Sequence, residues 1–188
     1  KGPYIEALPD FEKGDLLRNL LEENGGFLHN AFSQLPDSLL DRALHSHQQK
    51  AFISACRDNK SLLVATGTGS GKTECFLYPL AHQLLNDPDP DEPGVRCLLI
   101  YPMNALANDQ LYYRIAPLFG QQLAEQKISF GRFTSQIRAN TSREEEESRL
   151  RGNDKLMHAL GGKIPSHWRL TREEMLERPP KILVTNYA

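Results

Sequence analysis

The pattern of apolar and polar positions changes near residue 60. Before it, apolar residues recur at helical spacing, which predicts helices over 16–21, 37–44 and 47–57. After it, short continuous apolar runs alternate with longer amphipathic stretches. Such runs are typical of strands that are buried on both faces of a sheet. The predicted strands are 61–65, 95–101, 128–134 and 181–185, and the helices predicted between the first three are 72–85 and 106–119.

Strands and helices that alternate at this spacing favour right-handed crossovers and a parallel sheet flanked by helices. The chain is therefore predicted to be an α/β protein. We expect residues 1–45 to form a helical leader and residues 46–188 to carry the sheet. Asp15 is expected to cap the first helix, and Asn24-Gly25-Gly26 to end it.

The stretch 138–180 departs from this alternation because it is rich in charged residues. It contains two capping-box signatures, Thr141 to Glu144 and Thr171 to Glu174, with a glycine-rich turn over 161–165 between them. We predict two charged surface helices around that turn, inserted into the sheet-bearing part. Trp168 is interpreted as an anchor of this insertion, with stacking on a base as the alternative.

Composition narrows the class of protein. The chain has 188 residues, 39% of them hydrophobic and 24% charged, which suits one soluble domain with a core. It contains no apolar run of 18 residues and no visible signal peptide, so neither a membrane span nor secretion is predicted. Its three cysteines are scattered, which argues against a disulfide framework or a zinc site and fits a reducing cytoplasm. A net charge of −2 excludes a histone-like binder but not local contacts with a nucleic-acid backbone.

A glycine-rich turn lies between the first predicted strand and the helix that follows it. It reads Thr66-Gly67-Thr68-Gly69-Ser70-Gly71-Lys72-Thr73. Strand, turn and helix in this order are the setting of a P-loop. There, glycines let backbone N–H groups face the phosphates of ATP, and the helix N-terminus adds partial positive charge. Lys72 is expected to reach the β- and γ-phosphates, and the Thr73 hydroxyl to coordinate Mg²⁺.

The candidate ATP site also includes a glutamine upstream of this turn. The amide of Gln48 has a donor and an acceptor, which the edge of adenine requires. Lys72 and Thr73 are the predicted catalytic residues. The full set of candidate cofactor-binding residues is Gln48, Thr68, Gly69, Ser70, Gly71, Lys72, Thr73 and Glu74.

Polar turns follow the other predicted strands. In an open parallel sheet, ligands gather at the carboxyl ends of the strands, and neutral donors there can position a sugar-phosphate backbone without reading bases. The candidate nucleic-acid contacts are Pro102, Met103, Asn104, Gln110, Thr134, Thr185 and Asn186.

These motifs together resemble the first RecA-like lobe of superfamily 2 DExH-type helicases. His47-Gln48 resembles the Q motif, and the turn at 66–73 resembles the helicase form of the P-loop, although the general pattern has glycine at Thr66. The stretch 101–110 resembles motif Ia, with Met103 where threonine is usual, and 184–187 resembles motif Ib. The resemblance is to a bacterial group that includes mitomycin-repair helicases, RecQ4-like helicases and large helicases of anti-phage defence.

The resemblance implies an ATP-dependent DNA helicase or translocase that uses ATP and Mg²⁺. It also implies parts beyond the printed sequence: a DExH strand after Ala188 and a second RecA-like lobe with an arginine finger. We therefore expect a fragment that binds nucleotide without turning it over. DNA is the expected partner, with repair or defence proteins as further partners. An RNA helicase and a nucleotide-gated assembly switch stay open as alternatives, whereas a small-molecule kinase lacks an acceptor site.

Overall fold

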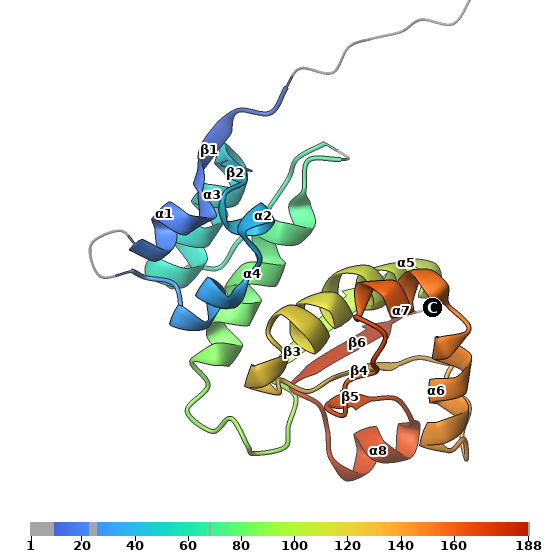
Figure 1. Cartoon of the computed structure of the whole chain (residues 1–188). Coiled ribbons are helices and arrows are strands. Elements are labelled where there is room, and N and C mark those ends of the chain that lie inside the picture. Colours follow the sequence, from blue (N-terminus) through green and yellow to red (C-terminus); the bar gives the residue numbers. More distant parts are fainter. Residues whose placement is uncertain (1–9, 23–25, 68, 188) are drawn as a thin grey trace, which may run out of the picture. The chain divides into compact units, whose positions relative to one another are not determined.

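The computed structural model describes residues 10–22, 26–67 and 69–187 (Figure 1). These residues pack into two compact units. Unit 1 takes the described residues up to Ser33 together with Asp37–Pro79, and unit 2 takes Gln34–Pro36 together with those from Leu80 onward. The 14-residue helix α4 (Lys72–Leu85) runs from one unit into the next and contains Pro79.

Unit 1 is mainly helical. Its elements are β1 (Lys13–Leu16), α1 (Leu17–Glu22), η2 (Asn30–Gln34), α2 (Asp37–Leu40), β2 (Ala43–His45), α3 (Ser46–Phe52), η3 (Ile53–Arg57) and the first part of α4. The strands β1 and β2 pair antiparallel. Aromatic rings fill the core, where Phe32 and Phe52 both meet Tyr78 edge-on.

The leader differs from the sequence prediction in two places. The helix predicted over 37–44 ends at Leu40, because residues 43–45 pair with β1 instead. The first predicted helix begins at Leu17, one residue later than expected, and Asp15 accepts the backbone N–H of Leu16 at 2.8 Å. Of its predicted end, Asn24 and Gly25 lie outside the described residues.

The strand predicted over 61–65 is wrong, because these residues have no regular structure. Leu63 is 96% exposed and Leu62 is 39% exposed. An apolar run becomes a strand only where a neighbouring strand takes up its backbone N–H and C=O groups. Among the described residues, no strand pairs with this run.

Among the described residues of unit 2, four strands form one sheet in the order β3-β6-β4-β5, and every neighbouring pair is parallel. The strands are β3 (Cys97–Tyr101), β4 (Phe130–Phe133), β5 (Trp168–Arg169) and β6 (Ile182–Asn186). Three of them confirm the strands predicted over 95–101, 128–134 and 181–185. The parallel α/β architecture expected from the sequence is therefore present.

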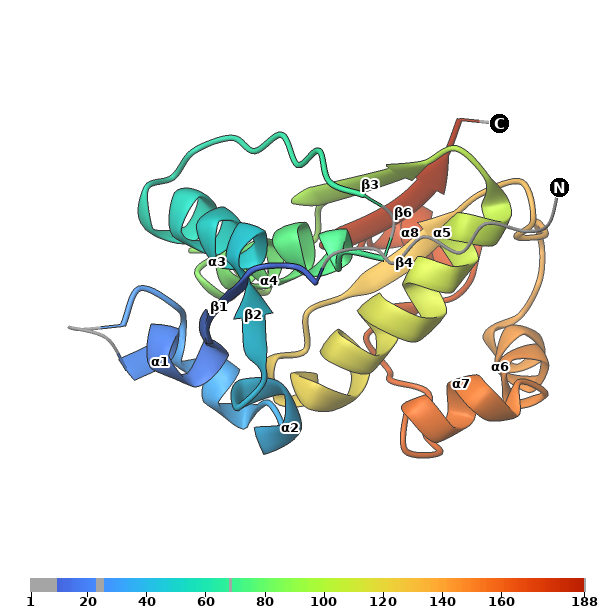
Figure 2. The same cartoon turned by 90° about the horizontal axis from the view of Figure 1, so that it is seen from above.

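Helices cover both faces of this sheet. The predicted helix over 106–119 is present as α5 (Asn104–Gln110) and two π-helical turns, η4 (Leu111–Ile115) and η5 (Leu118–Gln122), which Figure 2 shows running alongside β4 and β6. Gly120 of η5 lies against Phe130, whereas a side chain on Gly131 would meet Met175 of α8 (Arg172–Glu177). Because successive strand residues point to opposite faces, η5 and α8 lie on opposite faces.

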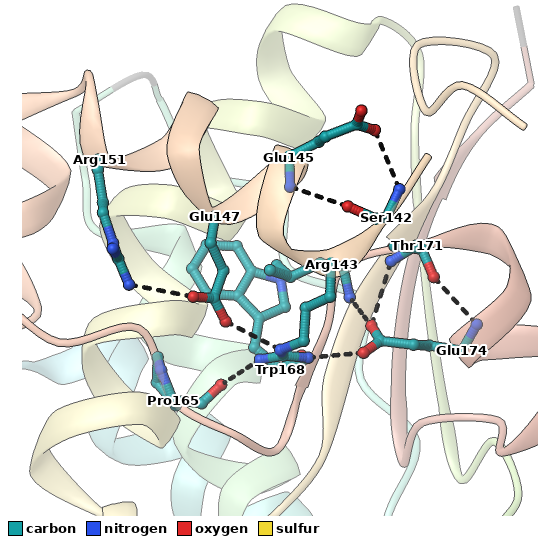
Figure 3. A network of polar contacts seen from close by, with 10 residues as sticks. Ser142, Arg143, Glu145, Glu147, Arg151, Pro165, Trp168, Thr171 and Glu174 are labelled. Carbon is teal, nitrogen blue, oxygen red and sulfur yellow. Dashed lines mark hydrogen bonds and ion pairs between the residues drawn. The ribbon is translucent and has the colours of Figure 1, made fainter. Parts of the chain in front are cut away.

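The charged stretch 138–180 folds around one arginine. It forms α6 (Arg143–Arg151), α7 (Asp154–Ala159), β5 and α8, so it holds one more helix than predicted. Arg143 donates to Glu147 at 2.9 Å, to Glu174 at 2.8 Å, and to the carbonyls of Trp168 and Pro165 (Figure 3). One guanidinium thereby ties α6, α8 and the approach to β5 together.

Two of the three helices in this stretch, α6 and α8, begin with capping boxes, and the box of α6 is shifted from its predicted place. Thr171 and Glu174 cap α8 as predicted. At α6 the box is formed by Ser142 and Glu145, one residue later than the predicted pair Thr141 and Glu144. Trp168 is buried against Phe130 and Tyr112, which confirms its interpretation as an anchor.

Candidate nucleotide-binding site and strand-end rim

The glycine-rich turn reaches the first residue of α4, as a P-loop requires. Gly69 and Gly71 have φ angles of 77° and 74°, a region that glycine enters without steric cost. A Cβ on Gly71 would collide with Nε2 of Gln48 and lie 3.1 Å from Oε2 of Glu74. The turn therefore needs glycine at this position both for its backbone conformation and for space. Thr68, one of the candidate residues, lies outside the described part of the chain.

The polar side chains of the turn bond within it. Nζ of Lys72 donates to the carbonyls of Thr66 at 2.9 Å and of Gly67 at 2.6 Å, so the ammonium group lies over the turn. Ser70 is fully buried, and its Oγ is 2.7 Å from Oγ1 of Thr66. A hydroxyl pair thus ties the first residue of the turn to the fifth.

Thr73 and Glu74 follow Lys72 in the first turn of α4. Oε1 of Glu74 lies 4.0 Å from the guanidinium of Arg42, which comes from the segment between α2 and β2. A carboxylate in the first helical turn also interacts favourably with the positive end of the helix dipole.

Helix α3 contacts the turn through two successive side chains. Nε2 of His47 lies 2.8 Å from the carbonyl oxygen of Ser70, and Nε2 of Gln48 donates to the carbonyl of Gly71 at 3.0 Å. The other end of the Gln48 amide accepts the backbone N–H of His45 at 2.9 Å. Both ends of this buried amide are bonded within the protein, so a contact with adenine would have to use its second hydrogen or second lone pair.

Three strand ends of unit 2 meet at one rim, because the register aligns them. Tyr101 at the end of β3 is opposite Asn186 of β6, and Phe133 at the end of β4 is opposite Thr185. The candidate nucleic-acid residues next to these strand ends are Pro102, Met103, Asn104, Thr134, Thr185 and Asn186. Gln110, the remaining candidate, ends α5 one helix length away.

The candidate rim residues differ in how they can meet a ligand. Met103 is 59% exposed and precedes α5 without capping it through its side chain. The Thr185 hydroxyl donates to the carbonyl of Phe133 at 2.7 Å, and Thr134 is buried. Buried polar atoms without a partner in the structure also gather here: Tyr101 Oη, Asn104 Oδ1, Asn108 Oδ1 and Thr134 Oγ1. Such atoms carry a desolvation cost that a polar ligand could relieve.

Acidic residues do not directly follow β3, β4 or β6, although a site that hydrolyses ATP would need carboxylates at a strand end. The described strands β3, β4 and β6 are followed by Pro102, Thr134 and Tyr187 rather than by acidic residues. No group of three or more histidine, cysteine, aspartate or glutamate side chains within residues 10–22, 26–67 and 69–187 is arranged to hold a metal ion. Over the same part of the chain, no helix combines the length and the hydrophobicity that crossing a bilayer requires.

Two contacts of the glycine-rich turn and the start of α4 could not be assigned from the sequence. His47 belongs to a sequence motif only as the neighbour of Gln48, and Arg42 belongs to none. The position of His47 next to Gln48, on a helix predicted to precede the P-loop, was the one signal of the first contact. The pairing of Arg42 with Glu74 joins residues 32 positions apart and appears only when the leader folds onto α4.

Comparison with known proteins finds related chains that cover parts of this one. Druantia protein DruE of Escherichia coli (strain UMEA 4076-1) is 40% identical over 139 residues, which is 70% of this chain and 8% of that protein. The ATP-dependent RNA helicase ROK1 of Meyerozyma guilliermondii is 38% identical over 66 residues, 35% of this chain and 12% of that protein. The uncharacterized ATP-dependent helicase MJ1574 of Methanocaldococcus jannaschii is 37% identical over 87 residues, 46% of this chain and 12% of that protein.

The chain therefore spans about a tenth of the length of these relatives. The family model of the DEAD/DEAH box helicases matches residues 46–184, which include α3, the glycine-rich turn and most of the sheet of unit 2. This match covers well over half of the sequence and agrees with the parallel sheet, the turn before α4 and the polar strand ends. The chain belongs to the DEAD/DEAH box helicase family.

Proposed function

We propose that this chain is the ATP-binding lobe of an ATP-dependent DNA helicase or translocase of the bacterial cytoplasm. The observation that carries the proposal is the turn at the start of α4, where two glycines adopt positive φ angles and Lys72 follows directly. In a P-loop, glycines in this conformation before a helix let backbone N–H groups face the phosphates, and the helix N-terminus adds partial positive charge.

Each residue of the turn would have its own role in binding ATP. Gly69 and Gly71 give the backbone its curvature, and Ser70 is buried to hold it. Lys72 would exchange its two carbonyl contacts for the β- and γ-phosphates, whose charge is a stronger partner for an ammonium group. Gln48 is assigned to the adenine edge through the free hydrogen and lone pair of its amide.

The site also fits the magnesium ion that accompanies ATP. Thr73 stands one residue after Lys72 at the start of α4, where a hydroxyl can act as one ligand. A side chain on Gly71 would meet Gln48 and Glu74, so glycine at this position lets α3 and the first turn of α4 pack closely against the glycine-rich turn. When bound, Mg²⁺ neutralises developing charge between the β- and γ-phosphates.

The rim of unit 2 is proposed to hold one strand of DNA by its backbone. Pro102 and Met103 form the turn before α5, Asn104 begins that helix, and Thr185 and Asn186 end the neighbouring strand. Thr134 and Gln110 complete the proposed contact set. Neutral donors on aligned strand ends position a backbone without reading its sequence, which suits a motor that moves along DNA. A second RecA-like lobe and partner proteins in DNA repair or anti-phage defence belong to the same proposal.

The main alternative is an RNA helicase, since relatives named as RNA helicases match this chain over shorter stretches. Backbone contacts do not separate the two, because RNA is distinguished by its 2′-hydroxyl and its groove shape. The other alternative is a nucleotide-gated switch that assembles partners without unwinding. Strand displacement by the whole protein would separate a motor from a switch.

The test of the ATP site is the substitution Lys72→Ala in the whole protein that carries this chain. Loss of the ammonium group removes the point charge that pairs with the β- and γ-phosphates, so we expect ATP hydrolysis to fall at least a hundredfold. Steady-state phosphate release measures this. Hydrolysis by Lys72→Ala at nearly the wild-type rate would contradict the proposed function.

A further inference from the structure

The carbonyl groups of the nucleotide-binding turn are held from outside by helix α3. Two successive residues, His47 and Gln48, contact two successive carbonyls, those of Ser70 and Gly71. A carbonyl oxygen can only accept, so Nε2 of His47 is the donor in its contact. The Gly71 carbonyl also accepts the backbone N–H of Glu74 at 3.3 Å, which begins the hydrogen bonding of α4.

Holding a carbonyl fixes the N–H group of the next residue. The described peptide bonds are all trans and planar, so the C=O of one residue and the N–H of the next point in opposite directions. His47 draws the Ser70 carbonyl toward α3, and the Gly71 N–H therefore points away from α3. In the same way, the contact between Gln48 and the Gly71 carbonyl directs the N–H of Lys72. Backbone N–H groups of this turn are the ones that receive phosphate oxygens.

The ring of His47 is itself held in place. It stacks nearly parallel to His45, with 5.5 Å between ring centroids and 12° between planes. Phe11 meets it edge-on with 5.8 Å between centroids. A donor whose ring is fixed by two neighbours loses little further freedom when it bonds, so its contact with the Ser70 carbonyl constrains the turn effectively.

We propose that His47 is a positioning residue for ATP: it orients the Gly71 N–H toward the phosphates by holding the Ser70 carbonyl. The proposal rests on the proposed ATP site and adds to it a residue that touches neither the phosphates nor the base. The hydrogen bond, rather than the aromatic ring, carries the effect. A variant that keeps the hydrogen-bond donor should therefore keep the KM for ATP near that of wild type, and a variant that keeps only the ring should raise it.

The test compares His47→Phe, His47→Gln and wild type in the whole protein, by the KM for ATP, the kcat of hydrolysis and thermal unfolding. Phenylalanine keeps the stacking on His45 without a donor, so we expect KM to rise about tenfold while kcat changes less than about twofold. Glutamine places an amide nitrogen at nearly the reach of Nε2 and should restore KM to within about twofold of wild type. The matched control is His158→Phe, on the exposed side of α7, which should leave KM unchanged.

A KM of His47→Phe within twofold of wild type would overturn the proposal, as would a His47→Gln variant that is folded and as weak as His47→Phe. If His47→Phe does not fold, His47→Gln is compared with His47→Asn, whose shorter amide does not reach the carbonyl. A lower KM for glutamine supports the proposal, and equal KM values refute it. Wild-type protein that fails to bind ATP would refute the proposed function and the role of His47 with it, whereas wild-type protein that binds ATP beside a His47→Phe variant of unchanged KM would refute only the role of His47.

Discussion

At the scale of single residues, the glycines of the glycine-rich turn before α4 are not equivalent. Gly71 has a positive φ and no room for a Cβ, whereas Gly67 has neither a positive φ nor any atom within 4 Å of the position of a Cβ. We predict that Gly71→Ala lowers the affinity for ATP about tenfold or more, since a left-handed conformation alone costs an alanine roughly 1–2 kcal/mol. Equilibrium binding of a fluorescent ATP analogue measures the change.

Gly67→Ala is the matched control for this substitution and should bind the analogue within about twofold of wild type. Equal losses in the two variants would mean that the conformation of the turn does not set its affinity. The turn could be located from the sequence because the phosphate binding proposed for it restricts which residues occur there. The contacts of His47 and Arg42 could not, because they depend on how the leader folds onto the turn.

At the scale of elements, the N-cap that α6 has in the structure, Ser142, can be compared directly with the N-cap predicted from the sequence, Thr141. Oγ of Ser142 accepts the N–H of Glu145 at 3.2 Å, and Glu145 accepts the N–H of Ser142 in return. We predict that Ser142→Ala lowers the free energy of unfolding by about 1 kcal/mol, the usual cost of losing an N-cap. Urea unfolding followed by circular dichroism measures it.

Thr141→Ala serves as the control in this comparison. The Thr141 hydroxyl makes one long contact, with the carbonyl of Arg138 at 3.4 Å, so the variant should lose less than about 0.5 kcal/mol. A larger loss for Thr141→Ala than for Ser142→Ala would favour the box predicted from the sequence. The sequence pattern located the helix but not its first residue, since serine and threonine both cap well and stand side by side here.

The network around Arg143 predicts a loss of stability in acid. Burial opposes ionisation of Glu174, but hydrogen bonds from Arg143 and from the backbone N–H groups of Leu170 and Thr171 outweigh it and hold the pKa of Glu174 below its ordinary value of 4.5. A lowered folded pKa means that the unfolded chain takes up the proton first. The contribution of Glu174 is therefore complete above pH 4.5 and declines as the pH falls below it.

Substitution of Glu174 by glutamine tests this pH dependence. We expect Glu174→Gln to lower the free energy of unfolding by about 1 kcal/mol at pH 7, a modest value because solvent partly screens the ion pair. The difference from wild type should shrink between pH 4.5 and pH 3. Urea unfolding at several pH values measures it, and a difference that stays constant down to pH 3 would count against the titration of Glu174.

At the scale of the whole molecule, the sequence predicted the parallel sheet correctly, but the first strand predicted for it is not a strand. The runs at 95–101, 128–134 and 181–185 become β3, β4 and β6, because each finds a parallel neighbour. The equally apolar run at 61–65 does not form a strand, since hydrophobicity alone specifies burial and not a pairing partner. The boundary between a leader and a sheet-bearing part at residue 45 stays a prediction.

For the candidate rim too, the sequence does not specify how the strands pair. The order of the polar turns could be derived from the sequence, but their alignment depends on the register that sets Tyr101 opposite Asn186 and Phe133 opposite Thr185. The internal bond of the Thr185 hydroxyl and the burial of Thr134 depend on packing that the sequence pattern does not encode. The part of the chain that matches the DEAD/DEAH box helicases includes the glycine-rich turn and most of the rim. A motor function would couple ATP hydrolysis at the turn to DNA binding at the rim.

ATP hydrolysis by the whole protein, with single-stranded DNA, duplex DNA and RNA each titrated in, tests that coupling most directly. We predict that DNA raises the rate of hydrolysis severalfold, that RNA does not, and that Lys72→Ala removes both the basal and the stimulated rates. Stimulation by RNA alone would contradict the choice of DNA and favour the RNA helicase. ATP bound without any response to the three nucleic acids would contradict the motor itself and favour a nucleotide-gated switch.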